Sequence, residues 1–278
     1  MNLLNKTLFL GLVTYAMIIM YMSMRYLNST DCNKSIDVIT GVLEKQSPDP
    51  ANAAVSDIHI SSIAGANSGS SCIPKVGLRP LKKRDDLLDL VMEHGFTTAI
   101  EIGVKGGNFA KHMLKHWKSC EKYHLVDLWA HQENYEDASN GSDKKHEYMY
   151  NRSQRRLKPW QNVTEYHRML STEAAKKFEK ESIDFIYIDA RHDYCGVKED
   201  IEHYWPILKP GGIMAGHDYN ENSEIPDQDW GLCGDGTRNE MAVKGAVNDF
   251  FLPKGYTISV TYYREDNYMS WMIQKRLC

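Results

Sequence analysis

Residues that could do acid or metal chemistry recur at the ends of short apolar runs in the C-terminal part of the sequence. The runs TTAIEIG, YHLVDLW, VTEYHRML, IDFIYIDA and GGIMAGHD have the length and composition of β-strands. In a parallel sheet the carboxyl ends of the strands share one edge, and ligands bind there. An acid at such an end can also cap the next helix, but capping explains four of them poorly. We therefore expect one binding site from Glu101, Asp127, Ser171, Asp189 and Asp218.

Two of these acids stand beside histidines. The segment DARHDY places His192 three residues after Asp189, and His217 directly precedes Asp218. Carboxylates from adjacent strands suit Mg²⁺ or Mn²⁺, and an imidazole within reach can remove a proton. A bound divalent cation at such a site would lower the pKa of a group that must lose a proton. The alternatives are that His192 is a surface residue near a helix start and that His217 has no role in the site.

The segment AIEIGVKGGNFAKHML predicts a strand, a glycine turn and a helix. Glu101 lies on the strand, Gly103 at the turn, and Gly106 with Gly107 just before the helix. Glycines at such a turn let backbone N–H groups approach a ligand. The dinucleotide pattern G-x-G-x-x-G is not met, which disfavours a nicotinamide cofactor. Asp127 follows at about the spacing of 20 residues at which an acid meets ribose hydroxyls, so the sequence predicts a nucleoside without a pyrophosphate.

The elements that must hold these residues alternate along the chain. Segments between the strands read as helices, among them residues 81–94, FAKHMLKHW, STEAAKKFEKE and VKEDIEHYWPIL. Such alternation predicts parallel strands with helices on both faces. The last runs, YTISVTYY and YMSWMI, are joined by REDN and predict an antiparallel hairpin at the sheet edge. The expected fold is a doubly wound α/β domain over residues 75–278, with a seven-stranded, mostly parallel, Rossmann-like sheet.

Four segments carry a resemblance to a known family. EIGVKGG, HLVDLW, IDFIYIDARHDY and LKPGGIMAGHDY resemble successive motifs of class I S-adenosylmethionine-dependent methyltransferases, over about Thr97 to Ile273. The resemblance implies that S-adenosylmethionine is the cofactor. It also implies that Glu101 and Gly103 border the methionine end, that Asp127 holds the ribose, and that Trp129 or Ser171 lies near the adenine. Further cofactor-binding residues are expected at Gly106, Gly107 and Asp189. Trp129 could equally be a buried aromatic residue, and Ser171 the N-cap of a helix.

The stretch DARHDY followed by GHDY resembles a subgroup, the metal-dependent sugar O-methyltransferases that decorate macrolides. This resemblance implies that Asp189 and Asp218 bind the metal and that His192 is the general base. At His217 the subgroup carries an acid, but histidine can also bind Mn²⁺. The function implied is methylation of a sugar or glycan hydroxyl by an S-adenosylmethionine-dependent O-methyltransferase, with Mg or Mn assisting.

Other functions stay open at this point. The acceptor could be a small phenolic or lipid alcohol. A luminal glycosyltransferase could use Asp227 and Asp229 as a D-x-D metal motif, although that motif sits in a polar loop and not after an apolar strand. A methyltransferase fold kept only for binding is a further alternative, against which the intact acids and His192 argue.

Two long polar segments leave the ligand-binding edge of the predicted sheet. They are WAHQENYEDASNGSDKKHE and NENSEIPDQDWGLCGDGTRNE. Long loops at this edge are usually lids or acceptor-binding surfaces. The aromatic residues Tyr135, Tyr219 and Trp230 lie in or beside them and could stack on sugar rings.

The N-terminal region differs in composition from the rest. Residues 7–24 carry no charge and just reach the length of about 20 residues that a membrane-spanning helix needs. No small-residue cleavage site follows, so residues 1–27 are expected to be a short tail and an uncleaved signal-anchor. Residues 28–74 are mostly small and polar and predict a flexible stem.

Composition bears on compartment and partners. The net charge of −4 offers no general nucleic-acid surface. Six cysteines are an even number that an oxidising lumen could pair, with connectivity left open. We therefore expect a type II membrane protein of the Golgi or endoplasmic reticulum with a luminal catalytic domain, a hydroxyl-bearing acceptor as partner, and no nucleic acid. The glycosylation motif N-x-S/T begins at Asn28, Asn33, Asn140, Asn151 and Asn162.

Overall fold

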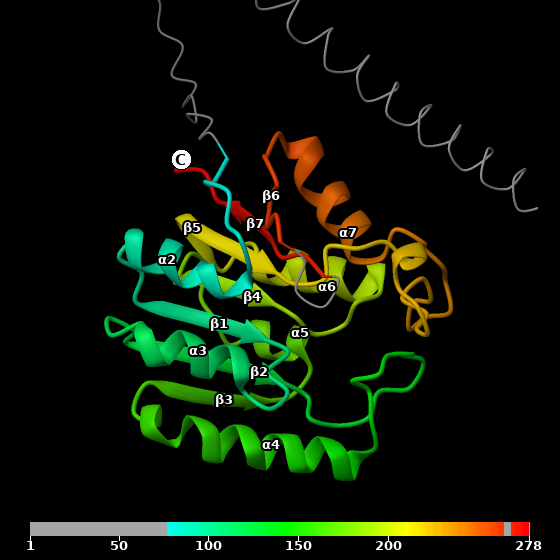
Figure 1. The fold of residues 1–278 in the computed structure, drawn as a ribbon, viewed down its shortest axis with the longest axis horizontal. Coiled ribbons are helices and arrows are strands. Elements are labelled where there is room, and N and C mark those ends of the chain that lie inside the picture. The colour runs from blue at the N-terminus through cyan, green and yellow to red at the C-terminus, as the bar shows by residue number, and fades with distance from the viewer. Residues whose placement is uncertain (1–76, 264–267, 278) are drawn as a thin grey trace, which may run out of the picture. The chain divides into compact units, whose positions relative to one another are not determined.

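A computed structural model describes residues 77–263 and 268–277 of the chain (Figure 1). The predicted signal-anchor at residues 7–24 and the stem at 28–74 lie outside these ranges. Within the described ranges, none of the helices combines the length and the apolar character that crossing a membrane requires.

The core of the domain is one seven-stranded sheet with the order β3-β2-β1-β4-β5-β7-β6 (Figure 1). The first five strands in this order pair in parallel, and β7 runs antiparallel to both β5 and β6. This arrangement confirms the predicted Rossmann-like sheet. The strands are β1 (Thr98–Ile102), β2 (Lys122–Asp127), β3 (Thr164–Arg168), β4 (Ile183–Ile188), β5 (Leu208–Gly216), β6 (Ser259–Val260) and β7 (Trp271–Gln274).

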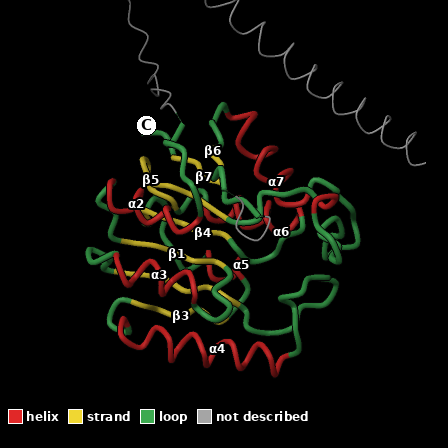
Figure 2. The backbone as a smooth tube through the Cα atoms, in the orientation of Figure 1, coloured by secondary structure: helices red, strands yellow, loops and turns green. Residues whose placement is uncertain are grey.

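Helices cover both faces of the sheet, as Figure 2 shows for the backbone path. One apolar cluster joins α2, α3 and α4 to one face, and a second joins α5, α6 and α7 to the other. Successive residues of a strand point to opposite faces, so a strand covered on both sides must be apolar throughout. The helices are α2 (Leu87–Glu93), α3 (Asn108–His116), α4 (Asp143–Leu157), α5 (Ser171–Ala175), α6 (Tyr194–Tyr204) and α7 (Ala242–Phe251), with the 3₁₀ turns η1 (Arg84–Asp86), η2 (Lys158–Trp160), η3 (Asn222–Glu224) and η4 (Leu252–Lys254).

The structure corrects several predicted boundaries. The first predicted loop ends earlier than expected, because Ser142 caps α4 by accepting a hydrogen bond from the Lys145 amide at 3.4 Å. The helix predicted to continue to residue 181 ends at Ala175, where the Phe178 amide bonds back only three residues. The side chain of Phe178 then packs against the core. In the predicted C-terminal hairpin, β7 lies inside the sheet and only the short β6 forms its edge.

Candidate active site

A large cavity opens at the carboxyl ends of β1, β2, β4 and β5. Its volume is about 1170 Å³, enough for a cofactor together with an acceptor group. Ten of the eleven residues predicted from the sequence for the site contribute to this region or its glycine turn, and Trp129 is the exception. The lining includes Glu101, Gly103, Gly106, Asp127, Ser171, Asp189, His192, His217 and Asp218, and Gly107 follows Gly106 at the start of α3.

The turn between β1 and α3 needs glycine at two positions for different reasons. Gly103 has a φ of 89°, and a Cβ atom there would lie 1.9 Å from the Asp189 carbonyl oxygen on the neighbouring strand end. Gly107 has a φ of 69° and is the N-cap of α3. Both φ values are in the left-handed region, which side chains with a Cβ atom disfavour. The turn can therefore pass close to β4 and leave backbone between Gly103 and Gly106 along the cavity wall.

The Asp127 carboxylate holds this turn from the end of β2. Its Oδ2 atom accepts hydrogen bonds from the amides of Val104 at 2.9 Å and Lys105 at 2.8 Å. Its Oδ1 atom accepts one from the Trp129 amide at 2.7 Å. Burial raises the pKa of Asp127, and the backbone hydrogen bonds oppose that shift. The carboxylate lines the cavity but is largely committed to the chain, and its contact with ribose stays a prediction.

Glu101 lies deeper in the cavity and is 1% exposed. Tyr123 donates a hydrogen bond from its hydroxyl to the Glu101 Oε2 atom at 2.7 Å. Burial raises the pKa of Glu101 to about 8, although the bond from Tyr123 opposes this. A buried acid with such a pKa can release its proton when a cationic group of a ligand binds beside it.

Of the two residues expected near the adenine, only Ser171 lines the cavity. Trp129 is 1% exposed, and its indole ring packs near Tyr150 and Tyr166. Its ring N–H donates to the Lys105 carbonyl oxygen at 2.8 Å. We therefore correct the expectation for Trp129, whose side chain belongs to the core beneath the glycine turn. Ser171 begins α5, and the N-cap of that helix is Leu170.

The acids of β4 and β5 meet His192 at one point of the cavity. The His192 Nε2 atom lies 3.0 Å from Asp218 Oδ2 and 3.6 Å from Asp189 Oδ1. One ligand atom from each of the three residues falls within 4.8 Å of the others, which is close enough to hold a metal ion. Asp218 lies two residues after the end of β5 and has a φ of 57°, and backbone strain of this kind clusters at functional sites.

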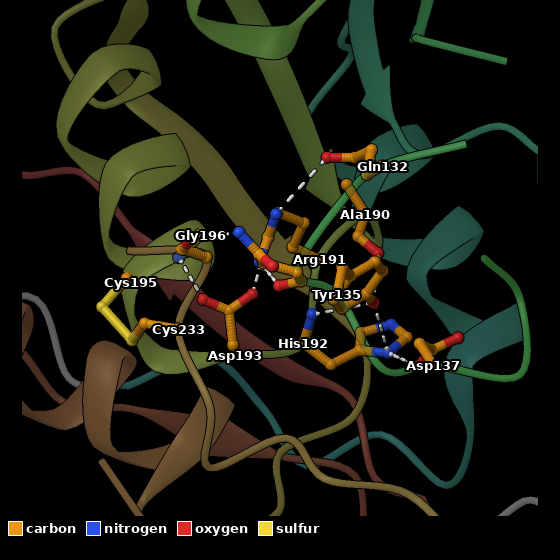
Figure 3. A network of polar contacts seen from close by, with 12 residues as sticks. Gln132, Tyr135, Asp137, Ala190, Arg191, His192, Asp193, Cys195, Gly196 and Cys233 are labelled. Atoms are coloured by element: carbon orange, nitrogen blue, oxygen red, sulfur yellow. Dashed lines mark hydrogen bonds and ion pairs between the residues drawn. A yellow bond between two sulfur atoms is a disulfide. The ribbon is translucent and has the colours of Figure 1, made fainter. Parts of the chain in front are cut away.

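Asp137, a residue that the sequence analysis missed, holds the His192 ring in place through its Nδ1 atom (Figure 3). The His192 Nδ1 atom lies 2.8 Å from Asp137 Oδ2, which also accepts the Trp230 indole N–H at 2.9 Å. Although burial would raise it, the bonds from His192 and Trp230 hold the pKa of Asp137 at about 2. The Tyr135 hydroxyl accepts a bond from the His192 amide at 3.2 Å. These contacts fix both the position and the tilt of the imidazole ring.

The environment of His192 favours a positive charge. Burial alone would lower its pKa, but the neighbouring Tyr135, the charge of Asp218 and the contacts with Asp137 and Asp189 outweigh it, so the pKa lies well above the usual value. Its Nε2 atom is buried and makes no hydrogen bond of acceptable geometry among the described residues. An imidazole nitrogen without such a bond, facing two carboxylates, fits a divalent cation at this point.

His217 lines the cavity beside Asp218. Its Nδ1 atom lies 2.8 Å from Asp218 Oδ1, the oxygen that faces away from His192. Burial lowers its pKa, but the bond to Asp218 outweighs burial and raises it. His217 therefore orients Asp218, and the cluster of possible metal-binding residues on this side of the cavity consists of Asp189, His192 and Asp218. The role of His217 as a metal ligand stays a prediction.

The second long loop reaches the site through a disulfide bond. Cys233 in this loop is bonded to Cys195 in the first turn of α6 (Figure 3). The same loop places the Trp230 ring 4.4 Å from the His192 ring and 5.7 Å from the Tyr268 ring. Tyr219, also considered for stacking, instead bonds to Asn248 on α7. Asp229 forms ion pairs with Arg238, and the metal-binding clusters among the described residues do not include it, which disfavours the D-x-D motif.

The sheet order, the glycine turn and the acids at the strand ends define a class I S-adenosylmethionine-dependent methyltransferase. Comparison with protein families agrees, because residues 100–219 match the family described as a methyltransferase domain. The chain is therefore a methyltransferase, and its cofactor is S-adenosylmethionine. The cavity fits this cofactor, since the backbone of the glycine turn and the buried acids Glu101 and Asp127 line it together.

Solved structures with a related fold include three methyltransferases. A protein assigned as a caffeoyl-CoA O-methyltransferase from Staphylococcus aureus is 16% identical, with a TM-score of 0.49 over 70% of this chain and 85% of that one. An O-methyltransferase from Bacillus cereus in complex with SAH is 16% identical, with a TM-score of 0.47 over 69% and 80%. The N-methyltransferase NodS from Bradyrhizobium japonicum is 12% identical, with a TM-score of 0.43 over 68% and 86%. No curated protein matched the sequence.

Proposed function

We propose that this methyltransferase acts on a hydroxyl group of a sugar or glycan, with a divalent cation and His192 activating that hydroxyl. The observation that carries the proposal is the convergence of Asp189, His192 and Asp218 within 4.8 Å at the cavity wall. A sugar hydroxyl is a poor nucleophile at neutral pH and needs both charge stabilisation and removal of its proton.

Each residue has a defined task in this proposal. S-adenosylmethionine, when bound, supplies the methyl group. Asp189 and Asp218 would hold Mg²⁺ or Mn²⁺, and a cation held there would lower the pKa of the acceptor hydroxyl. His192 takes the proton at Nε2, and Asp137 keeps Nδ1 protonated and stabilises the imidazolium that forms. Asp189 and Asp218, which face His192 Nε2, would attract its proton less strongly with a cation between them, so the imidazole would be neutral and able to act as a base.

His192 cannot serve as base and metal ligand at once. Its Nδ1 atom is engaged by Asp137, so only the Nε2 lone pair faces Asp189 and Asp218. We assign that lone pair to the proton, because two carboxylates already supply the oxygen ligands that Mg²⁺ prefers. The two possible roles of His192 can be told apart by experiment, because loss of a base lowers the rate whereas loss of a ligand lowers metal affinity.

The walls around this cluster support a polar, ring-shaped acceptor. Tyr268 and Trp230 both line the cavity, with ring planes 30° apart, and aromatic faces of this kind can stack on sugar rings. Polar side chains from the first long loop, including Gln132 and Asn140, line the same cavity. A small phenolic alcohol would leave much of this polar surface without partners.

Location in the secretory pathway is supported by two features of the described domain. The disulfide bond between Cys195 and Cys233 would persist in an oxidising lumen. The glycosylation motif at Asn162 lies in an exposed turn before β3. We propose a type II membrane protein of the Golgi or endoplasmic reticulum, with the membrane as a partner through residues 7–24, which lie outside the described residues.

A methyl-transfer assay with the purified full-length chain tests the catalytic proposal. Labelled S-adenosylmethionine is incubated with glycans, simple phenols and lipid alcohols, with and without a chelator. Asp218→Asn should abolish most turnover but spare cofactor binding, and chelation should mimic it. His192→Ala should lower the rate by about 10² to 10⁴, the usual contribution of a positioned base, with metal affinity retained. Asp89→Asn, an exposed acid outside the cavity, is the matched control.

The outcomes separate the parts of the proposal. Transfer to phenols alone would reject the glycan acceptor and keep the site chemistry. Lost metal binding in His192→Ala would make His192 a ligand. Full activity of His192→Ala in the presence of chelator would reject the metal-assisted mechanism.

A further inference from the structure

Two histidines meet on neighbouring strands outside the cavity. His124 is on β2, and His167 is on the edge strand β3. The His124 Nδ1 atom lies 3.1 Å from the His167 Nε2 atom. Neither residue lines the active-site cavity, so the proposed methyl transfer gives them no task. Two imidazole nitrogens this close share either a proton or a metal ion.

Glu165 brings a carboxylate to the same point. Its Oε2 atom lies 3.9 Å from His124 Nδ1, and its Oε1 atom lies 3.7 Å from His167 Nε2. One ligand atom from each of the three residues lies within 4.8 Å of the others, which is close enough for the three to hold one metal ion. Histidine nitrogen and carboxylate oxygen both bind Zn²⁺, at distances of about 2.0 to 2.2 Å.

The three side chains His124, Glu165 and His167 are enclosed on one side and open to solvent on the other. The two histidine side chains are 13% and 8% exposed, whereas Glu165 is 46% exposed. The Phe178 ring packs edge-on against both imidazoles, with ring centroids 4.8 and 5.4 Å away. The apolar wall fixes the histidines, and the exposed Glu165 side leaves an entry path and room for a water molecule as a fourth ligand.

We propose that His124, Glu165 and His167 form a Zn²⁺ site that ties the edge strand β3 to β2. Two imidazoles and one carboxylate are a common ligand set for zinc, whereas Mg²⁺ prefers oxygen ligands only. The Lys122 ammonium group lies 2.9 Å from Glu165 Oε2 and competes with the cation for that oxygen. The site is separate from the Asp189 and Asp218 cluster, so it does not depend on the proposed acceptor or reaction.

Zinc stoichiometry of the full-length chain tests this proposal. Equilibrium dialysis against Zn²⁺ is carried out on the wild type, His167→Ala, Asp218→Asn and the double variant. His167→Ala should lose one equivalent of zinc in both backgrounds, together with the zinc-dependent rise in melting temperature. Glu165→Gln should fold as the wild type does and bind this zinc at least about tenfold more weakly. His116→Ala is the matched control, because His116 also lies beside another histidine, with ring centroids 5.7 Å apart.

Equal zinc content in the wild type and His167→Ala would overturn the proposal and leave a histidine pair that shares a proton. Should His167→Ala not fold, unchanged zinc affinity in Glu165→Gln would overturn it as well. Loss of zinc in His116→Ala as large as that in His167→Ala would show binding to surface histidines in general and would reject the site.

Discussion

At the scale of single residues, the cavity contains a buried acid whose protonation state responds to what binds beside it. Glu101 has a pKa of about 8 because it is buried, so it is mostly protonated at neutral pH without a ligand. S-adenosylmethionine carries ammonium and sulfonium cations, and a nearby cation favours the ionised carboxylate. Cofactor binding should therefore remove a proton from Glu101.

This coupling predicts a pH dependence of cofactor affinity. The free protein holds the extra proton below pH 8 and the complex does not, so affinity should rise as the pH increases from 6 to about 8 and then level off. Calorimetry at several pH values, in buffers of different ionisation enthalpy, measures both the affinity and the released proton. Glu101→Gln should bind more weakly with a flat profile. A sloping profile in that variant would assign the effect to another group.

Asp127 combines two roles that mutation can separate. Its carboxylate accepts three backbone N–H bonds from the glycine turn and the end of β2, in addition to the ribose contact predicted from the sequence. A carboxylate that satisfies buried amides is structural as well as functional, because its removal leaves those donors unpaired at a cost of about 1 to 3 kcal/mol each.

Asp127→Ala should therefore lower the melting temperature of the protein even without cofactor, and should also weaken binding of S-adenosylhomocysteine. Thermal unfolding in the absence of ligand and calorimetry in its presence measure the two effects. Asp143→Asn, which affects one backbone bond to His131 outside the cavity, is the control. An unchanged melting temperature with weakened binding would leave ribose as the main partner of Asp127.

At the scale of elements, two loops that look featureless in the sequence complete the site. The first contributes Asp137 and Tyr135, and the second contributes Trp230, whose indole bonds to the same Asp137 oxygen as His192. The disulfide bond between Cys195 and Cys233 ties the second loop to α6, next to the strand end that carries His192.

Loss of this disulfide should loosen the acceptor side of the site and spare the cofactor side. In the double variant Cys195→Ser/Cys233→Ser we expect reduced kcat/KM for the acceptor and unchanged affinity for S-adenosylhomocysteine. The cross-link spans 38 residues, so its removal should also cost about 3 to 4 kcal/mol of unfolding free energy. Cys120→Ala, at the free buried cysteine, serves as control. Acceptor kinetics equal to the wild type would contradict a positioning role for the disulfide.

Strands and loops differ in how far the sequence predicts them. Strands such as IDFIYIDA are apolar on both faces because helices cover them, so their places and their terminal acids follow from pattern alone. Asp137 and His192 are far apart in sequence and meet only through tertiary folding. No local pattern marks an acid in a polar loop as the partner of His192. The family resemblance predicts Trp129 or Ser171 near the adenine, but the Trp129 ring packs against Tyr150 and Tyr166 in the core.

At the scale of the whole molecule, the described domain limits which predicted glycosylation motifs are compatible with its fold. The Asn140 side chain donates to the carbonyl oxygens of Gln132 and Tyr135 at 2.7 Å and accepts from the Gln132 amide at 2.9 Å. A glycan on this nitrogen would break the loop that carries Asp137. Asn162 is exposed in the turn before β3.

If the domain is luminal, Asn162 should carry a glycan and Asn140 should not. Expressed in secretory cells, the full-length chain should migrate faster after endoglycosidase treatment, and Asn162→Gln should reduce that shift by the mass of one glycan. Asn140→Gln should leave the shift unchanged and lower activity, because it disturbs the loop behind Asp137 and His192. Asn28 and Asn33 lie outside the described residues, so each variant is compared with a parent that lacks both motifs. A parent chain without any endoglycosidase-sensitive shift would argue against a luminal domain but would leave the fold and the methyltransferase site as they are.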